Sequence, residues 1–167
     1  TAGCIRTDGT LWMWGRGDLG QLGDNSTVYR SSPTQIPGTW SSFSSSSYQG
    51  FGIKTNGTLW AWGINEKGQL GLNDAVSRSS PTQIPGTSWS HTEDKFDGGG
   101  HGGIAVRTNG TLWSWGRNVH GALGLNQANG IRISSPTQIP GTTWSKVAAT
   151  ANNGRLAIKT DGTLWVW

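Results

Sequence analysis

The chain has 167 residues, a formal net charge of +4, 27 glycines and 11 tryptophans. Charged residues make up 13%, against about 25% in an average globular protein, and glycine is more than twice its usual share of about 7%, so short strands with tight turns are favoured over a helical bundle. No run of about 18 apolar residues occurs, so the sequence predicts no membrane-spanning helix.

One sequence block occurs four times along the chain. Residues 5–15 read IRTDGTLWMWG, and the same pattern starts again at Ile53, Val106 and Ile158. The starts are 48, 53 and 52 residues apart, which is a period typical of repeat architectures. We therefore treat 1–167 as part of a single domain. It is divided into repeats 5–52, 53–105 and 106–157 and a partial fourth repeat, 158–167.

Each copy of this block predicts a β-hairpin. The runs Ile-Lys-Thr and Thr-Leu-Trp-x-Trp are rich in strand-forming residues, and an Asp-Gly or Asn-Gly dipeptide separates them. The dipeptides begin at Asp8, Asn56, Asn109 and Asp161. We expect type I′ turns there, with positive φ at both central residues, because Asp and Asn tolerate that conformation.

Two tryptophans follow each turn, two residues apart. They are Trp12 and Trp14, Trp60 and Trp62, Trp113 and Trp115, and Trp165 and Trp167. Alternate residues of a strand face the same side of a sheet. Burying one indole removes about 150–250 Å² from water, so we expect these rings to be hidden against the neighbouring repeat.

Two further strands complete each period. The block Ser-Ser-Pro-Thr-Gln-Ile-Pro-Gly begins at Ser31, Ser79 and Ser134. Proline cannot donate to a strand ladder, so this block predicts a loop or an outer edge strand. One more strand is expected after each of the next tryptophans, Trp40, Trp89 and Trp144. Each period thus predicts four short antiparallel strands, which is one propeller blade.

The motif TNGTLWAWGxNxxGQLG, which ends at Gly71, resembles the signature of RCC1 (regulator of chromosome condensation) repeats, especially the bacterial and phage versions. The resemblance covers essentially the whole chain. It implies an all-β fold of four-stranded antiparallel blades, in a ring that usually has seven. At about 50 residues a blade, 167 residues supply just over three blades. We expect a fragment of a longer chain, in preference to an arc that other subunits complete.

The repeats themselves suggest no catalytic, cofactor or metal site. All tryptophans and prolines fall at repeated positions, which a structural role explains. The GxGxxG match at 15–20 lacks the surrounding βαβ unit and is not kept in the other copies, so it predicts no phosphate site. Cys4 is the only cysteine, which excludes an internal disulfide, and we expect it to be a small buried strand residue.

The positive charge does not predict a nucleic-acid partner. Four basic residues occupy one repeat position: Arg6, Lys54, Arg107 and Lys159. Such charges are spread around a ring, whereas nucleic-acid-binding proteins gather theirs into a patch or a stripe.

One segment, 91–101, breaks the repeat. It reads HTEDKFDGGGH and holds three of the nine acidic residues and two of the three histidines. A tolerated surface insertion explains it most simply. Contact with a partner is the functional interpretation, and a weak metal site is a third, although no zinc or calcium ligand spacing is matched. The candidate partner-contact residues are His91, Glu93, Asp94, Lys95, Asp97 and His101.

The resemblance implies a binding or structural module and no enzyme or cofactor. We expect a protein partner, or a host-surface or virion component, and an extracellular or virion location, besides contact with the rest of the propeller. The alternative is a regulator that exchanges guanine nucleotide on a small GTPase, as the eukaryotic founder of the family does. A hydrolase is the third possibility, but no Ser-His-Asp or paired-carboxylate pattern supports it. A fold does not by itself fix a function.

Overall fold

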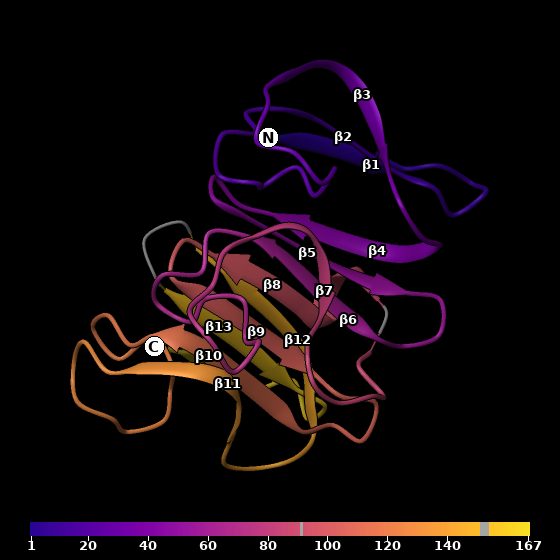
Figure 1. Cartoon of the computed structure of the whole chain (residues 1–167). Helices are drawn as coiled ribbons and strands as arrows, with labels where there is room; N and C mark the ends of the chain where they lie inside the picture. Colours follow the sequence, from indigo (N-terminus) through magenta and orange to yellow (C-terminus); the bar gives the residue numbers. More distant parts are fainter. Residues whose placement is uncertain (91, 151–153) are drawn as a thin grey trace.

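The computed structural model describes residues 1–90, 92–150 and 154–167, and almost all of its regular structure is β-strand. The one helical element among these residues is a single 3-10 turn, η1 (Glu93–Lys95). The strands form four antiparallel sheets, which follow one another in chain order from the indigo first sheet at the top of Figure 1. The predicted all-β fold is confirmed.

Two of the sheets have four strands and two have three. The first contains β1 (Ala2–Ile5), β2 (Leu11–Gly15) and β3 (Arg30–Ile36). The second contains β4 (Trp40–Ser45), β5 (Gln49–Lys54), β6 (Leu59–Gly63) and β7 (Arg78–Gln83). The third contains β8 (Phe96–Gly99), β9 (Gly102–Val106), β10 (Leu112–Arg117) and β11 (Arg132–Ile139). The fourth contains β12 (Trp144–Ala149), β13 (Arg155–Lys159) and β14 (Leu164–Val166).

The proline-containing block forms the outer edge strand, as predicted. β3, β7 and β11 each carry its Ser-Ser-Pro-Thr-Gln sequence and lie at the end of their sheet. At the opposite edge, β4, β8 and β12 lie side by side. An edge strand can accommodate a residue without an N–H donor, which a central strand cannot.

The hairpin turns differ from the predicted type I′ geometry. Gly9 has a φ of 81°, whereas Asp8 is not at positive φ. The N–H of Gly9 bonds to the carbonyl of Arg6, and the N–H of Arg6 bonds to that of Thr10, which is a three-residue loop with a glycine bulge. Asp and Asn interchange here because both supply an Oδ1 acceptor. Oδ1 of Asp8 accepts from the Thr10 N–H at 3.0 Å and from its hydroxyl at 2.6 Å.

The second tryptophan of a pair fastens one sheet to the loop of the preceding sheet. The buried indole of Trp62 donates to the carbonyl of Gln21 at 3.1 Å, and that of Trp115 donates to the carbonyl of Gln69 at 3.0 Å. A Cβ on Gly71 would lie 2.9 Å from the Trp115 ring. This contact explains why the repeated Gly-Gln-Leu-Gly block ends in glycine.

The first tryptophan of a pair is only half-buried, in contrast to the prediction. A repeated cation covers it. The Nζ of Lys54 lies 3.6 Å from the ring centre of Trp60 and 5.2 Å from that of the fully buried Trp40. Arg107 and Lys159 lie over the corresponding tryptophans of the next two repeats. Burial lowers the pKa of Lys54, and the aromatic faces attract its charge.

Two further predictions of burial are wrong. Cys4 is exposed, although it lies in β1. Trp165 is 49% exposed, and its neighbours Leu164 and Val166 are also exposed. Leu59 and Ala61, the counterparts of Leu164 and Val166 in the second sheet, are buried because the third sheet packs on them. No further sheet among the described residues covers the equivalent face of the fourth.

We expect the glycine that contacts the buried indole to be the position of the repeat that least tolerates substitution. Gly71→Ala places a methyl group against Trp115 at a φ of 71° and should lower the free energy of unfolding by roughly 2–4 kcal/mol, because backbone strain and overpacking add. Gly121→Ala is the matched control, since Gly121 has a φ of 85° with no atom within 4 Å of an added Cβ. It should cost only about 1–2 kcal/mol. Urea denaturation measures the free energy of unfolding of both variants. Equal losses would contradict the close contact between Gly71 and the Trp115 ring.

Candidate partner-binding site

The structure separates the residues of the predicted contact loop. His91 and the side chain of Glu93 lie outside the described part of the chain. Asp94 and Lys95 precede β8, Asp97 lies within it, and His101 follows it. Since the edge strand β8 runs between them, Asp94 and Lys95 lie at one end of that strand and His101 lies at the other. Their contact with a partner stays a prediction.

The charged residues before β8 are paired with the fourth sheet. Lys146 lies 3.2 Å from Asp94, and the Nζ of Lys95 donates to the carbonyl of Ser145. Burial disfavours the charge of Asp94, but hydrogen bonds from Lys146 and Thr92 outweigh it and lower its pKa. These contacts therefore connect the segment before β8 of the third sheet to the fourth sheet.

Asp97 joins three neighbouring edge strands. One carboxylate oxygen accepts from the Ser44 hydroxyl of β4 at 2.7 Å and from the Gly98 N–H at 2.8 Å. The other accepts from the Ala149 N–H of β12 at 2.8 Å. Sequence reasoning missed Ser44 and Ala149, because they lie 53 and 52 residues from Asp97 and only the sheet register brings them there.

A polar hollow of about 400 Å³ opens beside Asp97. Its lining includes the serines 45–47, Tyr48 and Thr150. Nearby, the buried Arg155 donates to the carbonyl of Gly102 at 3.3 Å. Burial lowers the pKa of Arg155, and the charge of Asp97 opposes that shift. The carboxylate oxygens of Asp97 already accept three hydrogen bonds within the chain.

The long loops 16–29, 64–77 and 118–131 leave the sheets at one end, together with the turn after β4. We call this end the loop face. Apart from the fourth sheet, all large exposed hydrophobic side chains among the described residues lie on it: Val28, Tyr29, Tyr48, Val76 and Ile131. Besides the fourth sheet, the loop face is therefore the apolar part of the described surface.

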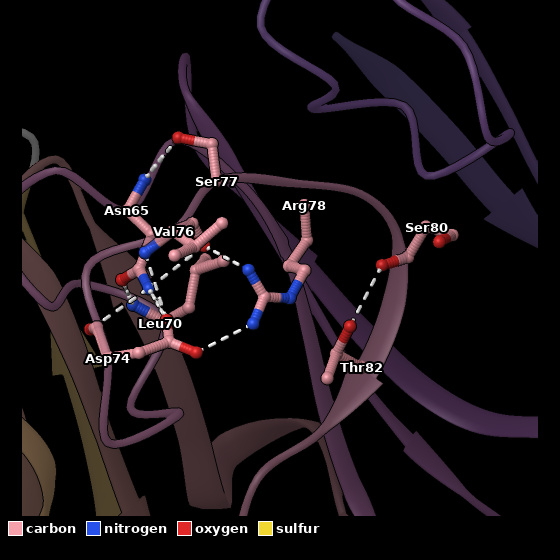
Figure 2. A network of polar contacts seen from close by, with 8 residues as sticks. All are labelled: Asn65, Leu70, Asp74, Val76, Ser77, Arg78, Ser80 and Thr82. Atoms are coloured by element: carbon pink, nitrogen blue, oxygen red, sulfur yellow. Dashed lines mark hydrogen bonds and ion pairs between the residues drawn. The ribbon is translucent and has the colours of Figure 1, made fainter.

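Buried asparagines hold the second and third of these loops in shape. Oδ1 of Asn65 accepts from the Leu70 N–H at 2.9 Å, and its Nδ2 donates to Asp74 and Val76, as Figure 2 shows. In the third repeat, Oδ1 of Asn118 likewise accepts from the Leu123 N–H at 3.1 Å, and its Nδ2 donates to a carbonyl of the same loop. Because these contacts are internal, the loops present their exposed side chains from a fixed backbone.

Ion pairs neutralise most charges of the first two loops. Asp24 lies 2.6 Å from Arg30, and Asp74 lies 2.6 Å from Arg78. Arg16 contacts both oxygens of Asp18, at 2.7 and 2.9 Å. The hydrogen bond from Arg16 lowers the pKa of Asp18 to about 2.

No group of three or more His, Cys, Asp or Glu that could hold a metal occurs within residues 1–90, 92–150 and 154–167. The same part of the chain contains no helix that is long and apolar enough to cross a membrane.

The family model for the regulator of chromosome condensation (RCC1) repeat matches three stretches, residues 8–48, 56–94 and 109–153, which together make up most of the chain. These stretches overlap the three repeats that the sequence predicts. No curated protein sequence matches the chain.

Several solved structures share the fold. Human WBSCR16 is 22% identical with a TM-score of 0.84, and the match covers 99% of this chain and 44% of that protein. Prp20p from Saccharomyces cerevisiae is 20% identical with a TM-score of 0.71, over 87% of this chain and 38% of that one. Yeast RCC1 (Prp20) bound to Kap60 is 20% identical with a TM-score of 0.75, over 95% of this chain and 39% of that one. The chain thus spans about two fifths of the length of these proteins.

We expect Asp97 to matter for stability more than its acidic neighbour. Asp97→Asn replaces an acceptor of N–H and O–H groups by an amide that can donate, and should lower the free energy of unfolding by about 1–3 kcal/mol. Asp94→Asn, the control, removes only a surface ion pair and should cost less than about 1 kcal/mol. Chemical denaturation of both variants tests this, and an equal cost would show that Asp97 does not join the strands.

The Arg16–Asp18 pair should give a defined pH dependence. The pKa of Asp18 falls from an ordinary 3.8 to about 2 in the folded chain, so the folded state binds this proton less tightly than the unfolded state. The stability from the pair is complete above about pH 4 and is lost as the pH falls through about 2. The difference in urea midpoint between wild type and Asp18→Asn should shrink over that range. A constant difference would contradict the pairing.

Proposed function

The chain belongs to the RCC1 repeat family, and we propose that it is a protein-binding or structural module, not an enzyme, whose loop face makes the contact. One observation carries this proposal. The three long loops each expose an aliphatic side chain, at 56% for Val28, 59% for Val76 and 42% for Ile131. A single exposed apolar residue is ordinary, but a row on one face is typical of an interaction surface.

The similar structures support a protein partner. Prp20p is described with binding properties to Gsp1p and histones, and yeast RCC1 with Kap60 bound to it. These are two structures of one yeast protein, which shares the fold and binds other proteins. The rigid loops of this chain offer a comparable platform, on which loop residues vary while the sheets stay constant.

We further propose that this module acts outside the cell or on a virion, as a surface or appendage component. The support is the resemblance of its repeats to bacterial and phage versions. Guanine-nucleotide exchange on a small GTPase is the alternative that the family resemblance implies. It predicts faster nucleotide release from a GTPase, which a surface module would not cause.

The loop face can be tested with a triple variant. Val28→Ser, Val76→Ser and Ile131→Ser together should leave the fold intact and reduce recovery of a specific partner by about ten-fold or more, because each contact loses apolar burial. The control is Thr7→Ala, Thr55→Ala and Thr108→Ala, three exposed residues in the hairpin turns at the opposite end of the sheets. Quantitative affinity capture from surface and virion fractions measures recovery.

Recovery that is equal for the two triple variants would refute the loop face as the contact surface. A nucleotide-release assay on small GTPases runs alongside. Accelerated release would favour the regulatory alternative over the surface module.

A further inference from the structure

Two arginines that flank the third loop face each other without a carboxylate. Arg117 ends β10, Arg132 begins β11, and the two are direct partners in the antiparallel register. Side chains in such a pair start about 4.5–5.5 Å apart, and like charges there repel. Within the described residues no carboxylate oxygen lies within 4.0 Å of either guanidinium. The Nε of Arg117 is buried and lacks a hydrogen-bond partner among those residues.

The first repeat shows what an arginine at this position binds. Arg16 is the counterpart of Arg117, since each follows the glycine that ends Trp-x-Trp-Gly. It grips Asp18 through two hydrogen bonds, at 2.7 and 2.9 Å. In the third repeat Val119 replaces that aspartate, while in the second repeat Ile64 replaces the arginine itself. The third repeat alone keeps the cation without its anion.

The third repeat also differs on the facing strand. The residues opposite this position in the first two repeats are Tyr29 and Ser77, which carry no charge, whereas the third has Arg132. The surroundings are also cationic. The pKa of His101 is lowered by burial and then by the charges of Arg117 and Arg155. Two fixed positive charges therefore meet at one point of the loop face.

We propose that Arg117 and Arg132 bind a carboxylate on an acidic segment of a partner protein. The inference rests on the proposed function and assigns chemistry to one part of the loop face. A carboxylate fits because a guanidinium pairs with it through charge-assisted hydrogen bonds, and Arg16 holds Asp18 by such bonds. The exposed Ile131 beside the pair adds apolar contact. Two cations without a basic stripe do not suit a nucleic acid.

The test uses substitutions that the other repeats already contain. The probe is a fluorescein-labelled peptide of alternating glutamate and glycine, measured by fluorescence anisotropy at about 50 mM NaCl, where screening is moderate. Arg117→Ile and Arg132→Ser should each weaken binding about three- to tenfold. Val119→Asp should weaken it similarly, because it supplies the carboxylate from within the chain.

Arg16→Ile is the matched control, because it removes an arginine that already holds a carboxylate, and it should leave the peptide affinity unchanged. Circular dichroism checks folding, and Arg117→Lys, which keeps the charge and loses the fork, replaces any variant that does not fold.

Equal affinities in all variants would overturn the proposal, as would stronger binding of duplex DNA or inorganic phosphate than of the peptide. If the arginine variants lose the peptide while the loop face still captures its partner, the site is supported and the capture depends on other loop residues. If the chain captures no partner but still binds the peptide, the result would instead count against the proposed function alone.

Discussion

The structure depends on the hydrogen bond between a buried indole and the loop of the preceding repeat. Trp62 and Trp115 each reach across to a backbone carbonyl, of Gln21 and Gln69, and each ring rests on a glycine. A buried indole N–H needs a partner, so sheet and loop fix each other. In a repeat array the stability arises largely from such contacts between neighbours, and here one side chain provides both apolar burial and a specific hydrogen bond.

This fastening leaves the loop tips free to vary. An indole holds the backbone of the first and second loops from beneath, and Asn65 and Asn118 hold the second and third loops from within. Exposed residues can therefore change without moving the scaffold, which is how loops on rigid frames acquire binding functions. The change from Asp18 to Val119 is of this kind, because it alters the charge of the loop face.

The irregular segment of the second repeat has a structural role of its own. Asp97 connects β4, β8 and β12, and Asp94 pairs with Lys146. A carboxylate with three donors at a junction of strands stabilises the relative placement of blades, since each lost partner would leave a polar group unsatisfied. The segment that looked most like a contact loop thus uses several of its charged side chains in contacts within the molecule.

The sequence alone determined the all-β class, the four-strand period, the hairpins, and the edge position of the proline block, because these follow from residues near one another in the chain. Only the tertiary structure decided the glycine-bulge turns, the exposure of Cys4, the partners of Asp97, and the meeting of Arg117 with Arg132. The loop 118–131 separates Arg117 from Arg132 in the sequence, and only the strand pairing shows that they face each other. Such contacts depend on strand register and sheet packing, and a one-residue shift in register would change every partner.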